Sequence, residues 1–202
     1  MSYQMKTKKG YDFFEVSSAF QKSIRRGLEE DALYWAAEMY HSNFDEYLWK
    51  RLRVITCEDV GLAEPHLMAT IQALYQTYQD IKKKKKDQSS QPSERLMLVQ
   101  AVMLLCRAQK SRVICHASIH FFRTHDFNHK PIPDFAYDQH TRKGKAMKRG
   151  LPHFFDEGAK LENMAEIEGE ELYLERAKKA LGNPGNDLFY SEEPLTPAEN
   201  EI

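Results

Sequence analysis

The stretch that decides the fold is Tyr47–Pro65, which reads YLWKRLRVITCEDVGLAEP. Its apolar residues recur at the helical interval and should face a core: Leu48, Leu52 and Ile55. Gly61 suits a helix end that needs a positive φ, and Pro65 suits the first turn of a following helix. The stretch therefore predicts two helices that meet at a tight, acidic corner.

The composition is that of an ordinary soluble globular protein, with 202 residues, 42% of them hydrophobic and 29% charged. The net charge of −1 disfavours a general polyanion binder, so any nucleic-acid contact should come from a local patch. No apolar run approaches the ~18 residues of a membrane span, and the N-terminus lacks an apolar signal core. Scattered cysteines suggest no disulfide framework and favour a reducing cytoplasm: Cys57, Cys106 and Cys115.

The segments before the corner predict two further helices. Apolar residues spaced four apart mark the first: Val16, Phe20 and Ile24. This helix should end near Gly27, and the acidic residues 29–31 lie where they would complement the dipole of the second helix. The second helix has an apolar inner face: Leu33, Ala36, Ala37 and Tyr40. Ser42 or Asn43 should then cap the helix that contains Leu48.

The segments after the corner predict three more helices. A continuous apolar stripe marks the first of them: Leu67, Ile71, Leu74, Tyr78 and Ile81. We interpret the lysine run 82–86 that follows as a solvated helix end, with a nucleic-acid contact as the alternative. The next helix, capped by Ser93, is apolar almost all round over 96–106, which predicts burial on most sides at the centre of the bundle. Ser111 should cap the last helix.

Together these segments predict an all-α fold, a bundle of antiparallel helices joined by short loops. We expect its core to include Leu33, Leu52, Ile71, Leu74 and Val102. The sequence changes character after about residue 124, where an irregular, partly helical extension begins. We predict a frayed N-terminus at 1–12, a helical domain at 13–135, a basic and then acidic extension at 136–182, and a flexible acidic tail at 183–202.

The extension contains a strongly basic segment between His140 and Gly150. It has five basic residues and no acid: Arg142, Lys143, Lys145, Lys148 and Arg149. If the segment is helical, Arg142, Lys145 and Arg149 share a face that phosphates could match, which makes the segment a candidate DNA contact. Pairing with the acidic stretch 162–175 is the alternative, and the sequence leaves both open.

Two other groups of residues are candidates for chemistry. Glu58 and Asp59 are adjacent, so their side chains diverge by about 100° on a helix and cannot form a facing acid–base pair. We expect them to hold the corner through backbone N–H groups or through Arg51 and Arg53.

The second group lies in the histidine-rich segment 115–153. His116 and His120 are four residues apart, a spacing that suits a metal site. No C-x-x-C pair or H-E-x-x-H motif accompanies them, so we favour a partly buried histidine pair. A metal-binding protein or an enzyme built on this segment is the alternative function.

Several short blocks, taken in order, resemble a known family. The blocks are KSIR at 22–25, DALYW at 31–35, CEDVGLAEP at 57–65, QAV at 100–102 and KS at 110–111. Together they resemble the C-terminal helical domain of MgsA, or replication-associated recombination protein A, a clamp-loader-like AAA+ ATPase of replication forks. The resemblance covers about 13–135. The motif residues are Ser23, Arg25, Trp35, Glu58, Asp59, Gly61, Lys110 and Ser111.

The resemblance implies a helical module that is related to the clamp-loader collar and is associated with tetramer formation. It implies that the partners are further copies of the chain, an AAA+ ATPase or other replication protein, and DNA. Gln109 and Arg112 depart from the family, which usually has proline and asparagine there. The sequence contains no G-x-x-x-x-G-K-[ST] phosphate loop. We therefore expect a non-catalytic oligomerisation and interaction module with no ATPase activity and no cofactor.

Overall fold

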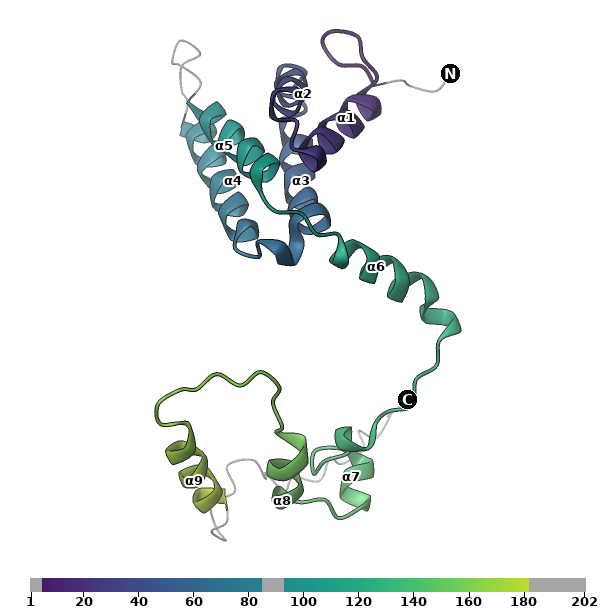
Figure 1. The fold of residues 1–202 in the computed structure, drawn as a ribbon, viewed down its shortest axis with the longest axis vertical. Coiled ribbons are helices and arrows are strands. Elements are labelled where there is room, and N and C mark those ends of the chain that lie inside the picture. The colour runs from purple at the N-terminus through teal and green to yellow at the C-terminus, as the bar shows by residue number, and fades with distance from the viewer. Residues whose placement is uncertain (1–4, 85–92, 182–202) are drawn as a thin grey trace, which may run out of the picture. The chain divides into compact units, whose positions relative to one another are not determined.

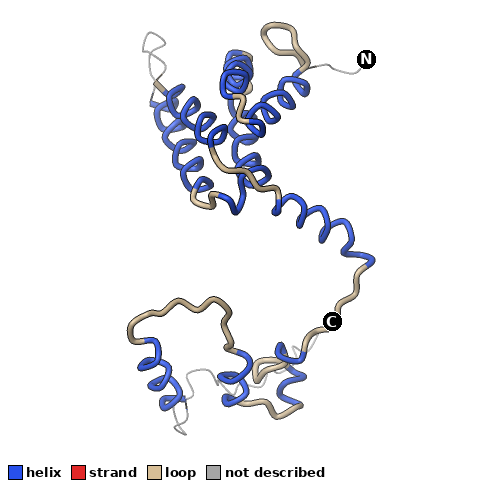
Figure 2. The backbone as a smooth tube through the Cα atoms, in the orientation of Figure 1, coloured by secondary structure: helices blue, strands red, loops and turns tan. Residues whose placement is uncertain are grey.

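The computed structural model describes residues 5–84 and 93–181, and these residues form helices and loops without a strand (Figures 1 and 2). The all-α prediction is confirmed. The chain divides into two units, Met1–His129 and Lys130–Ile202, so the boundary precedes the domain end expected at 135. The acidic tail predicted at 183–202 and most of the lysine-rich loop lie outside the described residues.

The first unit is a helical bundle with α3 at its centre. The bundle helices are α1 (Phe13–Arg26), α2 (Glu29–His41), α3 (Asp45–Ile55), α4 (Leu67–Lys84) and α5 (Glu94–Arg107). Four side chains of α3 are fully buried: Leu48, Trp49, Leu52 and Ile55. Of the predicted core, Leu52, Ile71 and Val102 are buried, and Leu33 and Leu74 pack against them partly exposed.

Local chemistry explains where these helices begin and end. The carboxylate of Asp12 accepts hydrogen bonds from the backbone N–H groups of Phe14 and Glu15 at the start of α1. Gly27 ends α1 with φ 69°, as expected. At the corner, α3 continues into a π-helical turn, η1 (Thr56–Val60), which ends at Gly61 with φ 53°, and a short 3-10 turn, η2 (Gly61–Ala63), follows. The predicted sharp corner therefore contains an extra wide turn.

Three local expectations differ from the structure. Residues 5–12, expected to be frayed, form a turn in which the Lys9 backbone N–H donates to the carboxylate of Glu38 at 2.9 Å. Ser42 and Asn43 do not cap α3, because the Ser42 hydroxyl donates to the Glu38 carbonyl and Phe44 precedes the helix. Neither Ser93 nor Arg112, the residues that precede α5 and α6, makes a side-chain cap; the Ser111 hydroxyl oxygen accepts only a long bond of 3.4 Å from Val113.

The prediction that α5 is buried on most sides is wrong for one face. Its inner residues, including Ala101 and Leu105, are buried against the other helices of the bundle. Leu96 is 65% exposed and Val99 is 39% exposed on the outer face. Both α3 and α5 contact the other bundle helices, and α5 in addition has one face exposed to solvent.

Beyond the bundle, α6 (Val113–Thr124) packs its first turns on η1 and η2 and then leads away, ending in η3 (His125–Phe127). The second unit has short elements: η4 (Asp134–Ala136), α7 (Arg142–Ala146), α8 (Leu151–His153), η5 (Phe154–Gly158) and α9 (Glu170–Leu181). No helix among the described residues is long and apolar enough to cross a membrane.

The central position of α3 predicts a large difference between two neighbouring residues. Leu52→Ala should lower the free energy of unfolding by about 2–5 kcal/mol, because Leu52 is fully buried and truncation leaves a cavity. Val54→Ala, on the same helix but 38% exposed, should cost less than about 1 kcal/mol. Urea denaturation followed by circular dichroism measures both. Equal losses would show that α3 is not the centre of the core.

Candidate functional site

The acidic corner is an ionic cluster that joins three parts of the first unit. Asp59 is fully buried, and Arg25 of α1 donates to its carboxylate through Nε at 2.8 Å. Arg112, just before α6, donates to Glu58 at 3.0 Å and lies 3.4 Å from Asp59. The Gln21 amide donates to both carboxylates, at 3.0 Å and 3.1 Å. The cluster therefore connects α1 and the residue that precedes α6, Arg112, to the corner.

The partners expected for the acidic pair are wrong. Arg51 donates to the side-chain oxygen of Gln21, and Arg53 donates to the Trp49 carbonyl and lies over the ring of Tyr75. The arginines that bind the carboxylates come from α1 and from the start of α6. Helical spacing within α3 could not reveal them, because they are far away in the sequence.

Six of the motif residues gather at this corner. The Ser111 backbone N–H donates to the Asp59 carbonyl at 2.9 Å, next to the side-chain cluster of Arg25 and Glu58. Gly61 has φ 53°, a backbone conformation that favours glycine, and a side chain there would also lie close to Ile114. Lys110 donates to the carbonyls that end α5, and burial lowers its pKa.

The other two motif residues lie elsewhere in the first unit. The Ser23 carbonyl accepts a hydrogen bond from the Leu28 backbone at 2.9 Å, which helps to end α1. Trp35 on α2 makes edge contacts with the rings of Tyr11 and Tyr34. Both residues hold the bundle together, and neither belongs to the corner.

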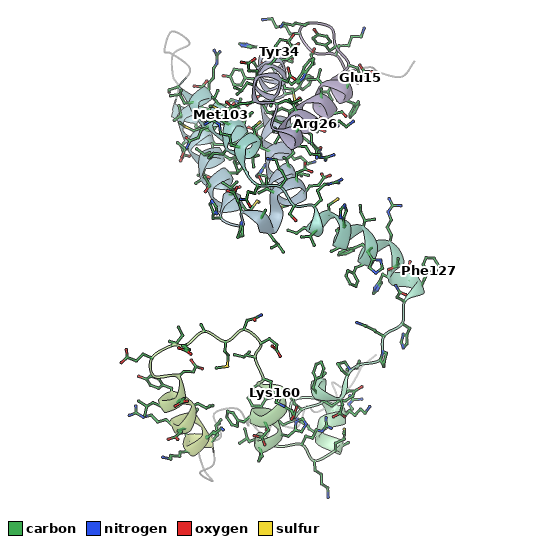
Figure 3. All side chains as sticks on the ribbon, in the orientation of Figure 1. Glu15, Arg26, Tyr34, Met103, Phe127 and Lys160 are labelled. Atoms are coloured by element: carbon green, nitrogen blue, oxygen red, sulfur yellow. The ribbon has the colours of Figure 1, made fainter. Side chains whose placement is uncertain are left out.

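Helix α6 has an unusual surface for a helix of a globular protein, because none of its residues is buried. Its exposed apolar side chains are Val113, Ile114, Ile119, Phe121 and Phe122. Figure 3 shows side chains standing out along α6 as far as Phe127, which is 86% exposed. The sequence did not reveal this exposure, because helical periodicity does not distinguish an apolar side that is exposed from one that is buried.

An open groove of about 510 Å³ lies between the root of α6 and the bundle. Its walls come from α3, η1, α4 and α6, and its apolar lining includes Val54, Met68, Ile114 and Ile119. Cys57 also lines it, with its sulfur 3.8 Å from the Met68 sulfur. Arg53 and Glu58 also line the groove, which is therefore mainly apolar with two charged side chains among its residues.

The side chains of the histidine-rich segment 115–153 do not come together at one site. The described residues contain no group of three or more histidine, cysteine or acidic side chains placed to hold a metal ion. His116 and His120 are exposed on α6, so the interpretation as a partly buried pair is wrong. His120 instead makes an edge contact with the Phe121 ring.

In the second unit, the basic segment forms a compact turn instead of one continuous helix. Thr141 caps α7 by accepting from the Gly144 backbone N–H at 3.0 Å. A side chain at Gly144 would lie 1.8 Å from the Asp138 carbonyl oxygen, so only glycine fits. Arg149 lies beyond the end of α7 and donates to the carbonyls of Asp134 and Tyr137 at 2.7 Å and 2.9 Å. The predicted shared face of Arg142, Lys145 and Arg149 is therefore wrong.

The remaining cations of this segment have different roles. Lys143 lies over the Tyr137 ring at 4.0 Å. Arg142, Lys145 and Lys148 are exposed. Among the described residues, no ion pair joins the basic segment to the acidic stretch 162–175. Arg149 of the basic segment pairs with Asp134 instead.

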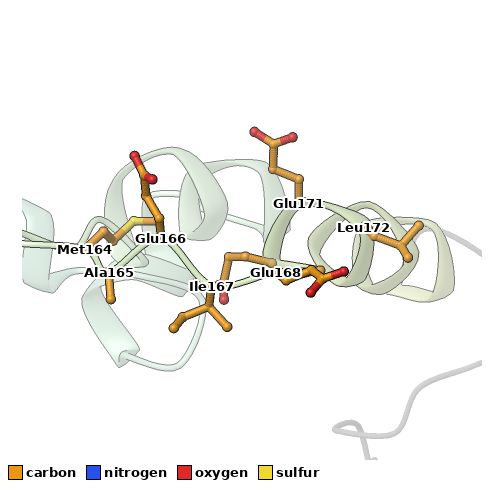
Figure 4. Close-up of a pocket in the computed structure, with 9 residues that line it drawn as sticks. Met164, Ala165, Glu166, Ile167, Glu168, Glu171 and Leu172 are labelled. Atoms are coloured by element: carbon orange, nitrogen blue, oxygen red, sulfur yellow. The ribbon is translucent and has the colours of Figure 1, made fainter.

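The second unit also contains a hollow of about 660 Å³ along residues 164–172 (Figure 4). Its walls are a single continuous stretch of chain, with Glu166, Glu168 and Glu171 beside apolar Ile167 and Leu172. The described residues that line it include no histidine or basic side chain.

The sequence of this chain is similar to part of a known protein family. Residues 28–179 match the family described as MgsA AAA+ ATPase C terminal, and this match runs past residue 135 into the basic segment. The replication-associated recombination protein A of Haemophilus influenzae is 31% identical over 136 residues, which are 67% of this chain and 28% of that protein. The Bacillus subtilis protein of that name is 30% identical over 161 residues, 75% of this chain and 35% of that protein. The chain thus spans about a third of the length of these relatives.

The ionic cluster predicts that Asp59 stabilises the fold. Asp59→Asn should lower the free energy of unfolding by about 1–3 kcal/mol, because the amide that replaces the buried carboxylate loses its charge and places an N–H donor against the Arg25 and Arg112 donors. Glu29→Gln breaks an ion pair with Arg107 on the exposed surface and should change stability little. Thermal and urea unfolding of both variants measure this. An Asp59→Asn variant as stable as Glu29→Gln would show that the cluster does not hold the corner.

Proposed function

Because the chain belongs to the MgsA AAA+ ATPase C-terminal family, we propose that it is a non-catalytic assembly module that acts in DNA replication, recombination or repair. The family inferred from the sequence blocks is thereby confirmed. The process is carried over from the relatives, which are replication-associated recombination proteins. The match describes the C-terminal region of these ATPases, so the proposal assigns this chain no ATP hydrolysis of its own.

The observation that carries the proposal is the exposed apolar surface of α6. His116, His120 and Arg123 give α6 a polar side, yet its large apolar side chains are exposed too, and exposed apolar patches rimmed by polar residues mark interaction sites. Phe121 and Phe122 are 66% and 85% exposed, and aromatic side chains are enriched in protein interfaces. An interaction that covers α6 would remove this surface from water.

The proposed partners follow from the family. Further copies of this chain come first, as a homo-oligomer for which the resemblance implies a tetramer. An AAA+ ATPase or another replication protein is the second partner. The three cysteines are unpaired, which supports a reducing cytoplasm as the place of assembly.

We also propose that the basic turn of the second unit contacts DNA. Its exposed cations Arg142, Lys145 and Lys148 are the side chains that could reach phosphates. Lys143 is exposed as well, but its ammonium lies over the Tyr137 ring, and Arg149 donates to backbone carbonyls, so we assign these two the role of holding the turn in shape.

Assembly predicts a solution mass that is a multiple of the 23.6 kDa chain. Replacing Phe121 and Phe122 by Glu should shift the mass toward one chain, because charges on an apolar contact must be desolvated. Leu96→Glu is the matched control, since Leu96 is 65% exposed on α5, and it should leave the mass unchanged. Light scattering with size-exclusion chromatography measures all three. A wild-type mass of one chain at every concentration would overturn the assembly proposal.

The DNA contact predicts a change in salt dependence. Replacing Arg142, Lys145 and Lys148 by Glu should weaken binding of a fluorescent DNA oligonucleotide and reduce the slope of log Kobs against log salt by up to about 2–3, since each lost phosphate contact removes about 0.7–0.9. The control reverses three exposed cations of the first unit, Lys22, Arg26 and Lys50, with the same change in net charge. Equal effects of the two triple variants, or no effect of the first, would remove the basic turn from the proposal.

A further inference from the structure

The loop that precedes α1, residues 5–12, is a basic turn attached to α2. The Lys8 backbone N–H donates to the Ser42 hydroxyl, just beyond the end of α2, at 2.9 Å. The Lys9 backbone N–H donates to the carboxylate of Glu38, whose side chain is only 3% exposed. A buried carboxylate needs hydrogen-bond partners of this kind, so the contact fixes the loop on the bundle.

Aromatic rings lie directly beside this loop. The Lys9 ammonium lies 4.5 Å from the centre of the Tyr34 ring and donates to its hydroxyl oxygen at 3.1 Å. Tyr34 of α2 is 42% exposed, and Tyr11 of the loop is 41% exposed. Both rings make edge contacts with the Trp35 ring, at centroid distances of 4.8 Å and 5.6 Å, which holds them in place. Figure 3 labels Tyr34 on α2 at this end of the bundle.

The charges that the loop presents to solvent are positive. Lys6, Lys8 and Lys9 are all exposed. The acids in contact with the loop have internal partners, because Asp12 accepts from the first backbone N–H groups of α1 and Glu38 accepts from the Lys9 backbone. A surface that combines exposed cations with exposed aromatic rings meets the two requirements of single-stranded nucleic acid, which are charge for its phosphates and a flat platform for its bases.

We propose that this surface binds single-stranded nucleic acid, with a base stacked on the Tyr34 ring and phosphates bound by Lys6 and Lys8. A duplex suits the site less, because its bases are already paired and stacked on one another. The loop lies in the first unit and precedes the family match at 28–179. The site is therefore distinct from the contact proposed at the basic turn of the second unit and does not depend on it.

Acidic side chains on α2 restrict the path of the strand. Glu30 and Asp31 are exposed and lie one helical turn before Tyr34, so they share its side of α2. Phosphates would be repelled there. The strand should therefore leave the Tyr34 ring over the loop, where Lys6 and Lys8 lie, and not along α2 toward its first turn.

The stacking contact is tested by the binding of fluorescent oligo-dT and oligo-U to the full chain, measured by fluorescence anisotropy. Tyr34→Ala should weaken binding about tenfold, because one stacked base is lost, whereas Tyr34→Phe keeps the ring and should bind like the wild type. An abasic oligomer keeps the phosphates without the bases, and Tyr34→Ala should leave its binding unchanged. Whichever of oligo-dT and oligo-U responds to Tyr34→Ala identifies the nucleic acid.

The matched control for the ring is Tyr173→Ala, since Tyr173 is 66% exposed and has the Arg176 guanidinium 5.7 Å from its ring centre. It should leave binding unchanged. An equal loss in Tyr34→Ala and Tyr173→Ala would overturn the inference. So would an equal loss for the abasic oligomer, which would indicate a simple polyanion site, or the absence of wild-type binding to both oligonucleotides at low salt.

The phosphate contact is tested by Lys6→Gln combined with Lys8→Gln, after thermal unfolding has shown that the fold is kept. This variant should bind both the oligonucleotide and the abasic oligomer more weakly and reduce the slope of log Kobs against log salt by up to about 1.4, at about 0.7 for each lost contact. Lys22→Gln with Lys50→Gln removes two exposed cations of the same unit and should change neither.

Equal effects of the two lysine variants would overturn the inference. The variant of the basic turn provides the separation from the proposed function. If the reversal at Arg142, Lys145 and Lys148 has no effect while Tyr34→Ala weakens binding, the contact at the basic turn fails and this site stands. If only the reversal weakens binding, this site fails and the basic turn stands.

Discussion

The carboxylate of Asp59 is completely buried, and its negative charge is held by Arg25 from one side and Arg112 from the other. A buried charge costs several kcal/mol unless it is paired and hydrogen-bonded, so this contact specifies one arrangement of the chain. Only a packing that brings the end of α1 and the start of α6 to the corner satisfies the carboxylate. The rest of the first unit is built outward from that requirement.

The corner also determines where α6 begins. The hydrogen bond from the Ser111 backbone to the Asp59 carbonyl and the packing of α6 on η1 and η2 anchor the first turn of α6. Beyond that turn, α6 has no bundle helix to cover it, and its apolar side chains stay exposed. The features that stabilise the corner thus create both the groove and the surface that we propose for assembly.

In the second unit, a basic side chain stabilises a turn by binding backbone carbonyls instead of a buried carboxylate. Arg149 satisfies two backbone carbonyls and pairs with Asp134, and Gly144 allows the chain to pass within contact distance of Asp138. A basic residue in this turn is therefore not automatically available to a phosphate. The distinction between cations that hold the turn and those exposed to solvent is what makes the proposed DNA contact specific to Arg142, Lys145 and Lys148.

The sequence by itself determined the helices and their ends at Gly27 and the corner, because helical periodicity and glycine stops depend on residues within a few positions of one another. It also determined the family, through short blocks of sequence in a fixed order. The tertiary structure alone decided which arginines bind Asp59, since Arg25 lies 34 positions away. It also decided that Arg149 is occupied and that α6 is exposed. Burial and ion pairing depend on which distant segments meet in space, and no local pattern records that.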